Sequence, residues 1–214
     1  MTRAAQPEPI SIPGPAGSIE AIIDRGAEGL EDAVAVICHP HPLYHGTMNN
    51  KVVHTIARSV AQLGRPALRF NFRGVGHSSG SYADGVGEAL DARAAVAWSR
   101  QRWPDAELWL AGFSFGAYIA LSIAAAETPA RLLTVAPPIQ RFDMAALEPP
   151  VCPWLIIQGA EDELVEASAV ETWASGLNPL PELCLLEETD HFFHGRLTLL
   201  RQVVTGFLAG GQAC

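Results

Sequence analysis

The residues with the clearest capacity for chemistry form the pattern Gly112-Phe113-Ser114-Phe115-Gly116, in which two glycines flank a serine. The pattern stands between an apolar run at 107–111, which predicts a strand, and residues 114–127, which predict a helix that is apolar on nearly every side. On such a tight turn the residues two positions from the serine must be small, because strand and helix approach closely. The same letters would also suit a serine that caps the helix. Because the turn would expose the hydroxyl, we predict that Ser114 is a nucleophile.

A serine hydroxyl is a poor nucleophile until a base takes its proton, and histidine is the usual base. The chain has seven histidines, and the expected chain order of serine, acid and histidine leaves only His191 and His194. We favour His191, which comes just after the last predicted strand on a turn into the final helix. His194 is one helical turn further on and is expected to face solvent or cap that helix.

The third member of such a site is a carboxylate that orients the imidazole and stabilises its charged form. Asp162 follows the predicted strand 154–158 and a glycine turn, which suits a loop acid, and we predict it in this role. Glu161 and Glu163 are local competitors, and all three carboxylates could instead form the negatively charged first turn of the next helix. Asp190 is adjacent to the histidine in sequence and therefore poorly placed to orient its ring.

An oxyanion formed at this serine would need preorganised amide donors. One should be the amide of Phe115, directly after the nucleophile. The other should come from the loop after strand 33–38, where two prolines lack an N–H and cannot donate. We choose Leu43 as the first free donor beyond the prolines, with His41 and Tyr44 as the alternatives.

The elements that must position these groups alternate between apolar, β-branched runs and helical patterns. The expected strands are 9–13 and 18–24 as a hairpin, 33–38, 66–72, 107–111, 131–136, 154–158 and 182–187. The expected helices are 48–63 capped by Thr47, a helix from Val86 to near Pro104, 114–127, 165–176 and 195–208. This alternation predicts an α/β fold with a mainly parallel twisted sheet and helices on both faces. Active groups then gather at the carboxyl ends of the strands.

Bulk composition narrows the class of protein. The chain of 214 residues is 49% hydrophobic and 17% charged, which predicts a single domain over 1–214 with a substantial core. Its net charge of −9 argues against nucleic acid or an anionic membrane as partner. No apolar run is long enough to span a membrane and no signal-peptide core is visible, so the expected location is cytoplasmic.

Four cysteines complete the inventory of reactive groups, and they lack a C-x-x-C pair. We interpret them as buried thiols rather than a disulfide framework, which is unlikely in a chain of this length and cysteine density. The four are Cys38, Cys152, Cys184 and Cys214.

Two further motifs carry a resemblance to a known family. The segment His39-Pro40-His41-Pro42 is followed by Gly46-Thr47-Met48-Asn49-Asn50-Lys51, and a second segment reads Asn71-Phe72-Arg73-Gly74-Val75-Gly76-His77-Ser78. Together with the serine motif they resemble the α/β-hydrolase superfamily, in particular its small lidless dienelactone-hydrolase-like and predicted carboxylesterase group. The resemblance covers nearly the whole chain.

The resemblance implies ester or thioester hydrolysis through an acyl-enzyme, with Ser114, Asp162 and His191 as the triad and no cofactor. Two departures matter. Dienelactone hydrolases proper use a cysteine nucleophile, so their substrate is not carried over to a chain with a serine at this position. The usual second glycine beside Gly46 is His45 here, which could alter the shape of the oxyanion loop.

Substrate preference is expected to follow from a missing cap. In larger relatives a cap domain enters between strands 131–136 and 154–158, whereas here the gap is only 137–153. We therefore predict an open site for a small-molecule ester with a short acyl group; the oligomeric state is left open. The residues expected to hold the substrate are Tyr44, Phe113 and Phe142.

Three other interpretations fit parts of this sequence. His39, His41 and His45 share one loop and could bind a metal, although the prolines and Leu43 replace the usual following ligands. The fold could serve as a catalytically silent binding protein, since a fold does not dictate function. The triad could also transfer its acyl group to another acceptor or cleave amides, because acyl-enzyme chemistry is shared.

Overall fold

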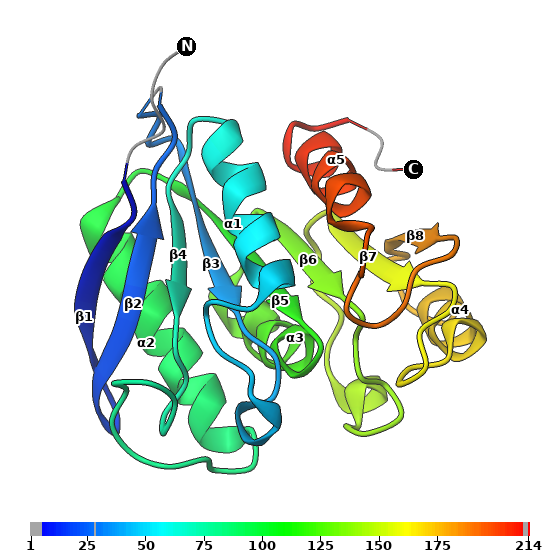
Figure 1. Ribbon diagram of the computed structural model, residues 1–214, viewed down its shortest axis with the longest axis horizontal. Coiled ribbons are helices and arrows are strands. Elements are labelled where there is room, and N and C mark those ends of the chain that lie inside the picture. Colours follow the sequence, from blue (N-terminus) through cyan, green and yellow to red (C-terminus); the bar gives the residue numbers. More distant parts are fainter. Residues whose placement is uncertain (1–5, 28, 212–213) are drawn as a thin grey trace.

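A computed structural model of the protein describes residues 6–27, 29–211 and 214. Its described residues form one eight-stranded sheet in the order β1-β2-β4-β3-β5-β6-β7-β8 (Figure 1). Strands β1 and β2 run antiparallel to their neighbours, and the other six are parallel. The strands are β1 Glu8–Gly14, β2 Gly17–Asp24, β3 Ala33–Cys38, β4 Ala67–Phe70, β5 Glu107–Phe113, β6 Arg131–Val135, β7 Trp154–Gly159 and β8 Glu182–Leu186. The predicted fold class is confirmed.

Helices cover both faces of the sheet, as Figure 1 shows. Helices α1 and α5 close one apolar core, and α2, α3 and α4 close the other. Strands β3 and β5 are buried almost throughout because side chains on both faces meet a helix layer. The helices are α1 Lys51–Gln62, α2 Val86–Arg102, α3 Phe115–Glu127, α4 Ala167–Ser175 and α5 Leu197–Leu208, with two short 3₁₀ turns, η1 Pro42–Tyr44 and η2 Met144–Ala146.

Helix α1 begins later than predicted. Asn50, not Thr47, is its N-cap, and the Asn50 side chain accepts hydrogen bonds from the Val52 and Val53 amides. The residues before the cap are held by the segment that follows β4 instead, because the Met48 amide donates to the Asn71 side chain at 2.8 Å. This anchor keeps the loop between β3 and α1 in an irregular conformation up to the cap.

The cysteines do not all behave as predicted. Cys38 is a fully buried thiol whose pKa is raised by burial, and Cys152 is half-buried. Cys184 and Cys214, however, are joined by a disulfide with 5.7 Å between their Cα atoms, so the interpretation as free thiols was wrong for this pair. Disulfides are rare in reducing compartments, and this bond therefore gives no support to the expected cytoplasmic location.

No cap domain stands between β6 and β7. The connecting residues 136–153 contain only the short η2 turn, and the site at the carboxyl ends of the strands is left uncovered.

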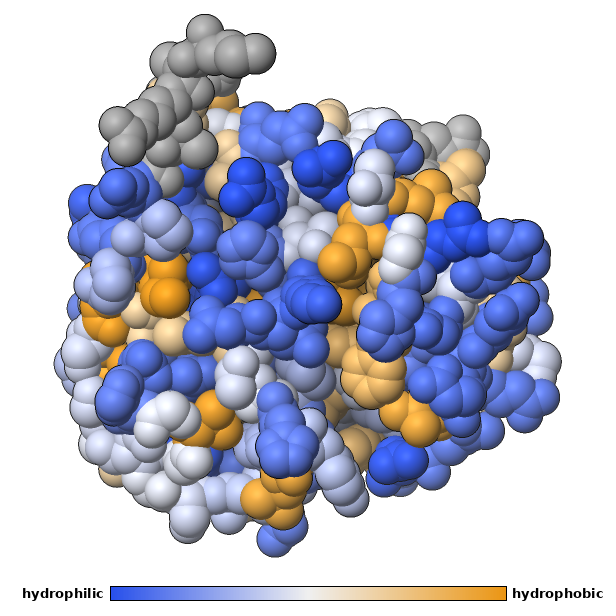
Figure 2. Space-filling model, viewed as in Figure 1, coloured by the Kyte–Doolittle hydropathy of each residue, from blue (hydrophilic) through white to orange (hydrophobic). Residues whose placement is uncertain are grey.

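Apolar residues gather in a strip that starts over α5 and runs down the middle right of the view in Figure 2. None of the helices in the described parts of the chain is both long and apolar enough to cross a membrane.

Candidate active site

The turn between β5 and α3 holds Ser114 in a backbone conformation that non-glycine residues rarely adopt. Its φ is 53° and its ψ is −121°. A Cβ on Gly112 would lie 2.0 Å from the Gly116 carbonyl oxygen, and one on Gly116 would lie 2.2 Å from the Cys38 carbonyl oxygen. Backbone contact therefore explains why glycines occupy both positions around the serine.

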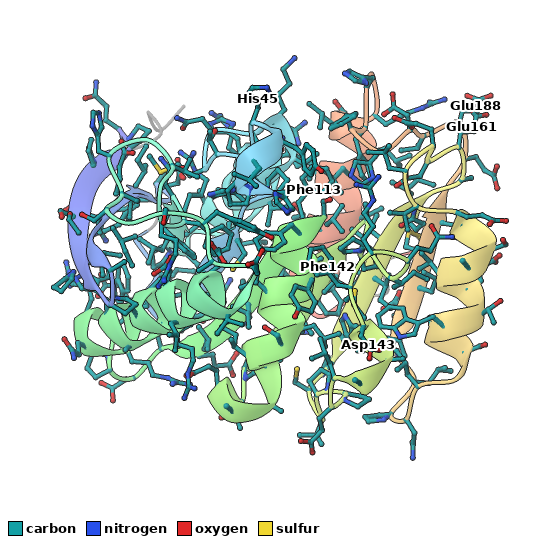
Figure 3. The ribbon with its side chains drawn as sticks, turned by 90° about the horizontal axis from the view of Figure 1, so that it is seen from below. His45, Phe113, Phe142, Asp143, Glu161 and Glu188 are labelled. Carbon is teal, nitrogen blue, oxygen red and sulfur yellow. A yellow bond between two sulfur atoms is a disulfide. The ribbon has the colours of Figure 1, made fainter. Side chains whose placement is uncertain are left out.

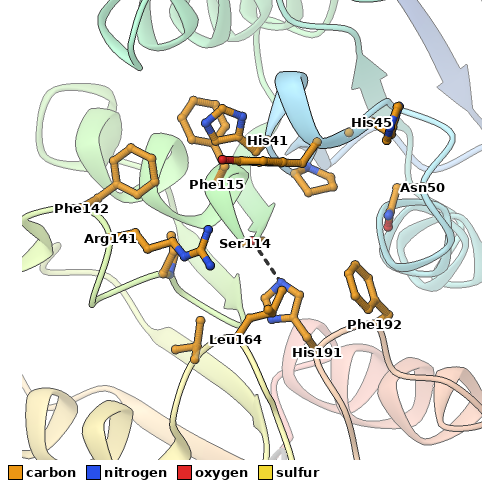
Figure 4. Close-up of a pocket in the computed structure, with 15 residues that line it drawn as sticks. His41, His45, Asn50, Ser114, Phe115, Arg141, Phe142, Leu164, His191 and Phe192 are labelled. Atoms are coloured by element: carbon orange, nitrogen blue, oxygen red, sulfur yellow. Dashed lines mark hydrogen bonds between the residues drawn. The ribbon is translucent and has the colours of Figure 1, made fainter.

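His191 meets this serine from the loop between β8 and α5. Its Nε2 lies 3.2 Å from the Ser114 Oγ, the contact drawn as a dashed line in Figure 4. The imidazole is buried, and its ring packs against that of Phe113 with 5.3 Å between centroids. The ring is thus fixed where it can accept the hydroxyl proton.

Asp162 completes a hydrogen-bonded chain of three side chains. Its Oδ2 lies 2.8 Å from the Nδ1 of His191, so a neutral imidazole donates from Nδ1 and leaves Nε2 free to accept. The other carboxylate oxygen accepts from the amides of Leu164 and Val165, and the Gln158 side chain donates to Oδ2 at 2.9 Å. Burial alone would raise the pKa of Asp162, but the hydrogen bond and charge of His191, with the two amides, hold that pKa below its ordinary value.

The competing residues lie elsewhere. His194 is exposed and pairs with Asp190 at 2.7 Å, away from the serine. Glu161 points to the periphery of the molecule in Figure 3. Glu163 touches the site only through its carboxylate, which accepts a hydrogen bond from the His191 backbone amide at 3.3 Å.

Two residues near the serine, Phe115 and His41, have backbone amides with no acceptor in the described chain. The Phe115 amide is in the first turn of α3, where no intrahelical acceptor exists. In the loop after β3, the Leu43 amide donates to the His41 Nδ1 and the Tyr44 amide donates to the His41 carbonyl oxygen. Of the three amides considered for this loop, only that of His41 has no acceptor within the described chain.

A cavity of about 360 Å³ opens at the reactive groups, and its walls are mainly apolar and aromatic (Figure 4). Two loops form most of the wall: the β3–α1 loop on one side and residues 138–142 on the other. The lining residues are Pro40, His41, Tyr44, His45, Gly46, Asn50, Ser114, Phe115, Pro138, Arg141, Phe142, Leu164, Val165, His191 and Phe192.

With this geometry established, comparison with known proteins gives the family. A family model described as the alpha/beta hydrolase fold matches residues 43–136. The uncharacterized protein RP471 of Rickettsia prowazekii (strain Madrid E) is 36% identical over 205 residues, covering 91% of this chain and 86% of the relative. The chain belongs to the alpha/beta hydrolase family.

Two solved structures narrow this placement. An alpha-beta serine hydrolase homologue from Coxiella burnetii is 43% identical, with a TM-score of 0.91 over 94% of this chain and 97% of that one. XC6422 from Xanthomonas campestris, described as an a/b serine hydrolase without lid, is 39% identical with a TM-score of 0.92, covering 98% and 97% of the two chains. This alpha/beta hydrolase therefore falls in the small lidless group that its sequence motifs resemble.

Two residues expected at the site of this alpha/beta hydrolase lie elsewhere. Leu43 does not line the cavity, and its amide is taken up by the His41 ring because η1 turns it back into the loop. Phe113 is fully buried behind the imidazole, because the alternation of β5 turns its side chain toward α1 and α5. Figure 3 shows this difference from Phe142, which lies on the α3 side. Tyr44 and Phe142 do line the cavity, as expected.

Three residues that the sequence did not predict at the site, Arg141, Leu164 and Phe192, also line the cavity. A signal existed for Arg141, since it follows the carboxyl end of β6, where active groups of this architecture collect. Leu164 and Phe192 are each within two residues of a predicted triad member and could have been found by proximity alone.

The histidines of the β3–α1 loop do not form a metal centre in the described structure, where no group of three His, Cys, Asp or Glu side chains is arranged as ligands. Both ring nitrogens of His39 are already used, by the Pro40 carbonyl oxygen at 2.6 Å and the Phe72 amide at 3.0 Å. Burial lowers the pKa of His39 to about 3, so its neutral form braces the start of the loop. Burial also lowers the pKa of His41.

Proposed function

We propose that this alpha/beta hydrolase cleaves carboxylic esters through an acyl-enzyme, with Ser114 as nucleophile, His191 as base and Asp162 as the residue that orients it. One observation carries the proposal: a serine on a strained turn lies 3.2 Å from an imidazole that is itself 2.8 Å from a buried carboxylate. This is the arrangement that nucleophilic acyl transfer needs, because the base can take the hydroxyl proton as the new bond forms.

In the first half of the reaction the Ser114 oxygen bonds to the ester carbonyl carbon while its proton passes to the His191 Nε2. The carbonyl oxygen gains the displaced electron pair, and we assign its stabilisation to the amides of Phe115 and His41. The carbon–oxygen bond to the alcohol then breaks, and the alcohol leaves with the proton from Nε2. Asp162 stabilises the imidazolium in between, and its low pKa keeps it ionised at neutral pH.

In the second half a water molecule attacks the acyl carbon and gives its proton to Nε2. The bond to Ser114 breaks, the serine oxygen regains the proton, and the carboxylic acid is released. The absence of a cap domain supports water as acceptor, because residues 136–153 contain only the short η2 turn and contribute one wall of the cavity. A cavity of about 360 Å³ also favours small substrates with short acyl groups.

A matched pair of serine variants tests this function. Ser114→Ala should lower turnover of a short 4-nitrophenyl ester by about 10⁴-fold or more and abolish labelling by a fluorophosphonate. Ser122→Ala changes a second serine of the same region, whose hydroxyl only donates to the Ile119 carbonyl in α3, and should retain both. Labelling or turnover that persists in Ser114→Ala would refute the assignment, and a wild-type protein that is neither labelled nor active would support the silent-fold interpretation.

A further inference from the structure

The cavity has a charge pattern opposite to that of the whole chain. The protein carries a net charge of −9, yet the residues that line the cavity include no aspartate or glutamate and one arginine, Arg141. Since the Asp162 carboxylate lies behind the imidazole, the side chain with a permanent charge on the cavity wall is this guanidinium.

The backbone around Arg141 is held in a defined turn. The amides of Arg141 and Phe142 both donate to the Pro138 carbonyl oxygen, at 3.0 and 3.2 Å. The Phe142 ring stacks on Tyr118 of α3 with 4.5 Å between centroids. In Figure 4 the guanidinium extends from this turn across the cavity toward Ser114. The loop therefore holds the guanidinium charge where a substrate bound at Ser114 would lie.

Arg141 also differs from most other arginines in its partners. Arg69 pairs with Asp24 and Arg73 with Asp91, both by way of buried or nearly buried carboxylates. Arg141 has no ion pair with any carboxylate in the described residues, and the side chains that line the cavity with it include no carboxylate. A planar guanidinium with free donors suits a carboxylate, which it can bind through two parallel hydrogen bonds.

We propose that Arg141 binds a carboxylate of the substrate, so that the preferred substrates are esters bearing a negative charge near the scissile carbonyl. This rests on the proposed ester hydrolysis, because it assigns the substrate class of the same site. Arg141 is a specificity-determining residue in this scheme. It takes no part in the proton transfers between Ser114 and His191.

Two pairs of matched esters test the proposal, one with the charge on the acyl side and one with it on the alcohol side. The first compares 4-nitrophenyl pentanoate with the 4-nitrophenyl half-ester of glutaric acid, after subtraction of the enzyme-free rate. The second compares phenyl acetate with 4-acetoxybenzoate. Each pair is measured as kcat/KM with the wild type and with Arg141→Gln, Arg141→Lys and Arg201→Gln, the last removing an equal charge from α5, outside the cavity lining.

For at least one pair, Arg141→Gln should lower kcat/KM for the anionic ester by about five- to tenfold while leaving the neutral ester unchanged. Arg141→Lys should retain part of the preference, and Arg201→Gln all of it. Added salt should reduce the wild-type preference and leave that of Arg141→Gln flat, because the partly exposed pair is screened. The pair whose anionic ester is affected by Arg141→Gln shows whether the substrate carboxylate lies on the acyl side or on the alcohol side of the ester.

The failures of the two proposals are distinguishable. A wild type that hydrolyses the neutral esters, with Arg141→Gln changing neither anionic ester relative to its neutral partner, would overturn the carboxylate site and leave ester hydrolysis standing. A wild type that hydrolyses none of the four esters would overturn both.

Discussion

The reactive centre and the wall of the cavity are built in different ways. At the centre, Ser114 is fixed by contact between backbones, and Asp162 and His191 are buried and hydrogen-bonded on several sides. On the wall, Tyr44 is 71% exposed and Arg141 projects from a loop without a side-chain partner in the described residues. A substitution at the centre disturbs packing and hydrogen bonds together. A substitution on the wall removes a solvent-exposed side chain and leaves the interior contacts in place. Chemistry and selectivity should therefore respond to substitution very differently.

Beyond the serine itself, the largest effect is expected at the buried carboxylate. Asp162→Asn should lower kcat for a short 4-nitrophenyl ester by about 10⁴-fold, because an amide would favour the wrong imidazole tautomer. Asp190→Asn is the matched control, since Asp190 pairs with the exposed His194, and it should retain activity. Equal losses in the two variants would show that Asp162 does not orient the imidazole.

Substitution in the turn between β5 and α3 should have its main effect on the free energy of unfolding. Gly116→Ala would bring a Cβ within 2.2 Å of a backbone oxygen, so we expect a loss of about 3 kcal/mol in the free energy of unfolding, measured with urea. Gly176→Ala, where the nearest atom would be 3.5 Å away, should be tolerated. A stable and fully active Gly116→Ala protein would mean that the turn is looser than its contacts indicate.

The boundary between centre and wall can be tested at His41, because we assign its amide to the oxyanion and its ring lines the cavity wall. Its φ of −54° suits proline, which would remove the N–H with little change of backbone. His41→Pro should lower kcat about 10²-fold below that of His41→Ala, which loses the same ring contacts but keeps the donor. Similar kcat values for the two variants would show that the His41 amide does not stabilise the oxyanion and that another amide of the loop does.

A smaller effect should appear in the pH dependence of stability. The unfolded chain binds a proton at His39 below about pH 6.5, while the folded protein does so only near pH 3. Because the unfolded state binds more protons in this window, stability falls on acidification, by about 2 kcal/mol between pH 7 and pH 5 for this group. Urea unfolding at both pH values should show a flatter dependence in His39→Gln than in the wild type, with the exposed His45→Gln as control.

The same division explains what could be predicted from sequence. The serine, the histidine and the acid each follow a strand end, and local rules of turn and chain order place them; the structure then brings all three together. The two prolines before Leu43 favour its amide as the donor, but the direction of an amide depends on how η1 turns, which residue types do not reveal. Phe113 is next to the serine in the chain, but the side of the sheet that its ring faces follows from the register of β5, which the sequence does not give.

Two features that depend on contacts between distant parts of the chain, the disulfide and the role of Arg141, could not be predicted from the sequence for a related reason. The Cys184–Cys214 disulfide joins two cysteines that are 30 residues apart in sequence, and no short cysteine motif predicts that pairing. Arg141 lies in a loop after the carboxyl end of β6, a position that indicates nearness to the site but no particular role. Its importance depends on which other charges are absent nearby, and only the arrangement in space shows that.

The segment between β6 and β7 has one more consequence. It leaves and re-enters the sheet on adjacent parallel strands, paired from Leu132 with Trp154 to Val135 with Ile157. Extra chain added between these anchor points costs little additional closure entropy, since that cost grows only with the logarithm of length. The protein is therefore a suitable recipient for grafted modules: an inserted segment could screen the entrance and reshape substrate range while the sheet beneath folds as before.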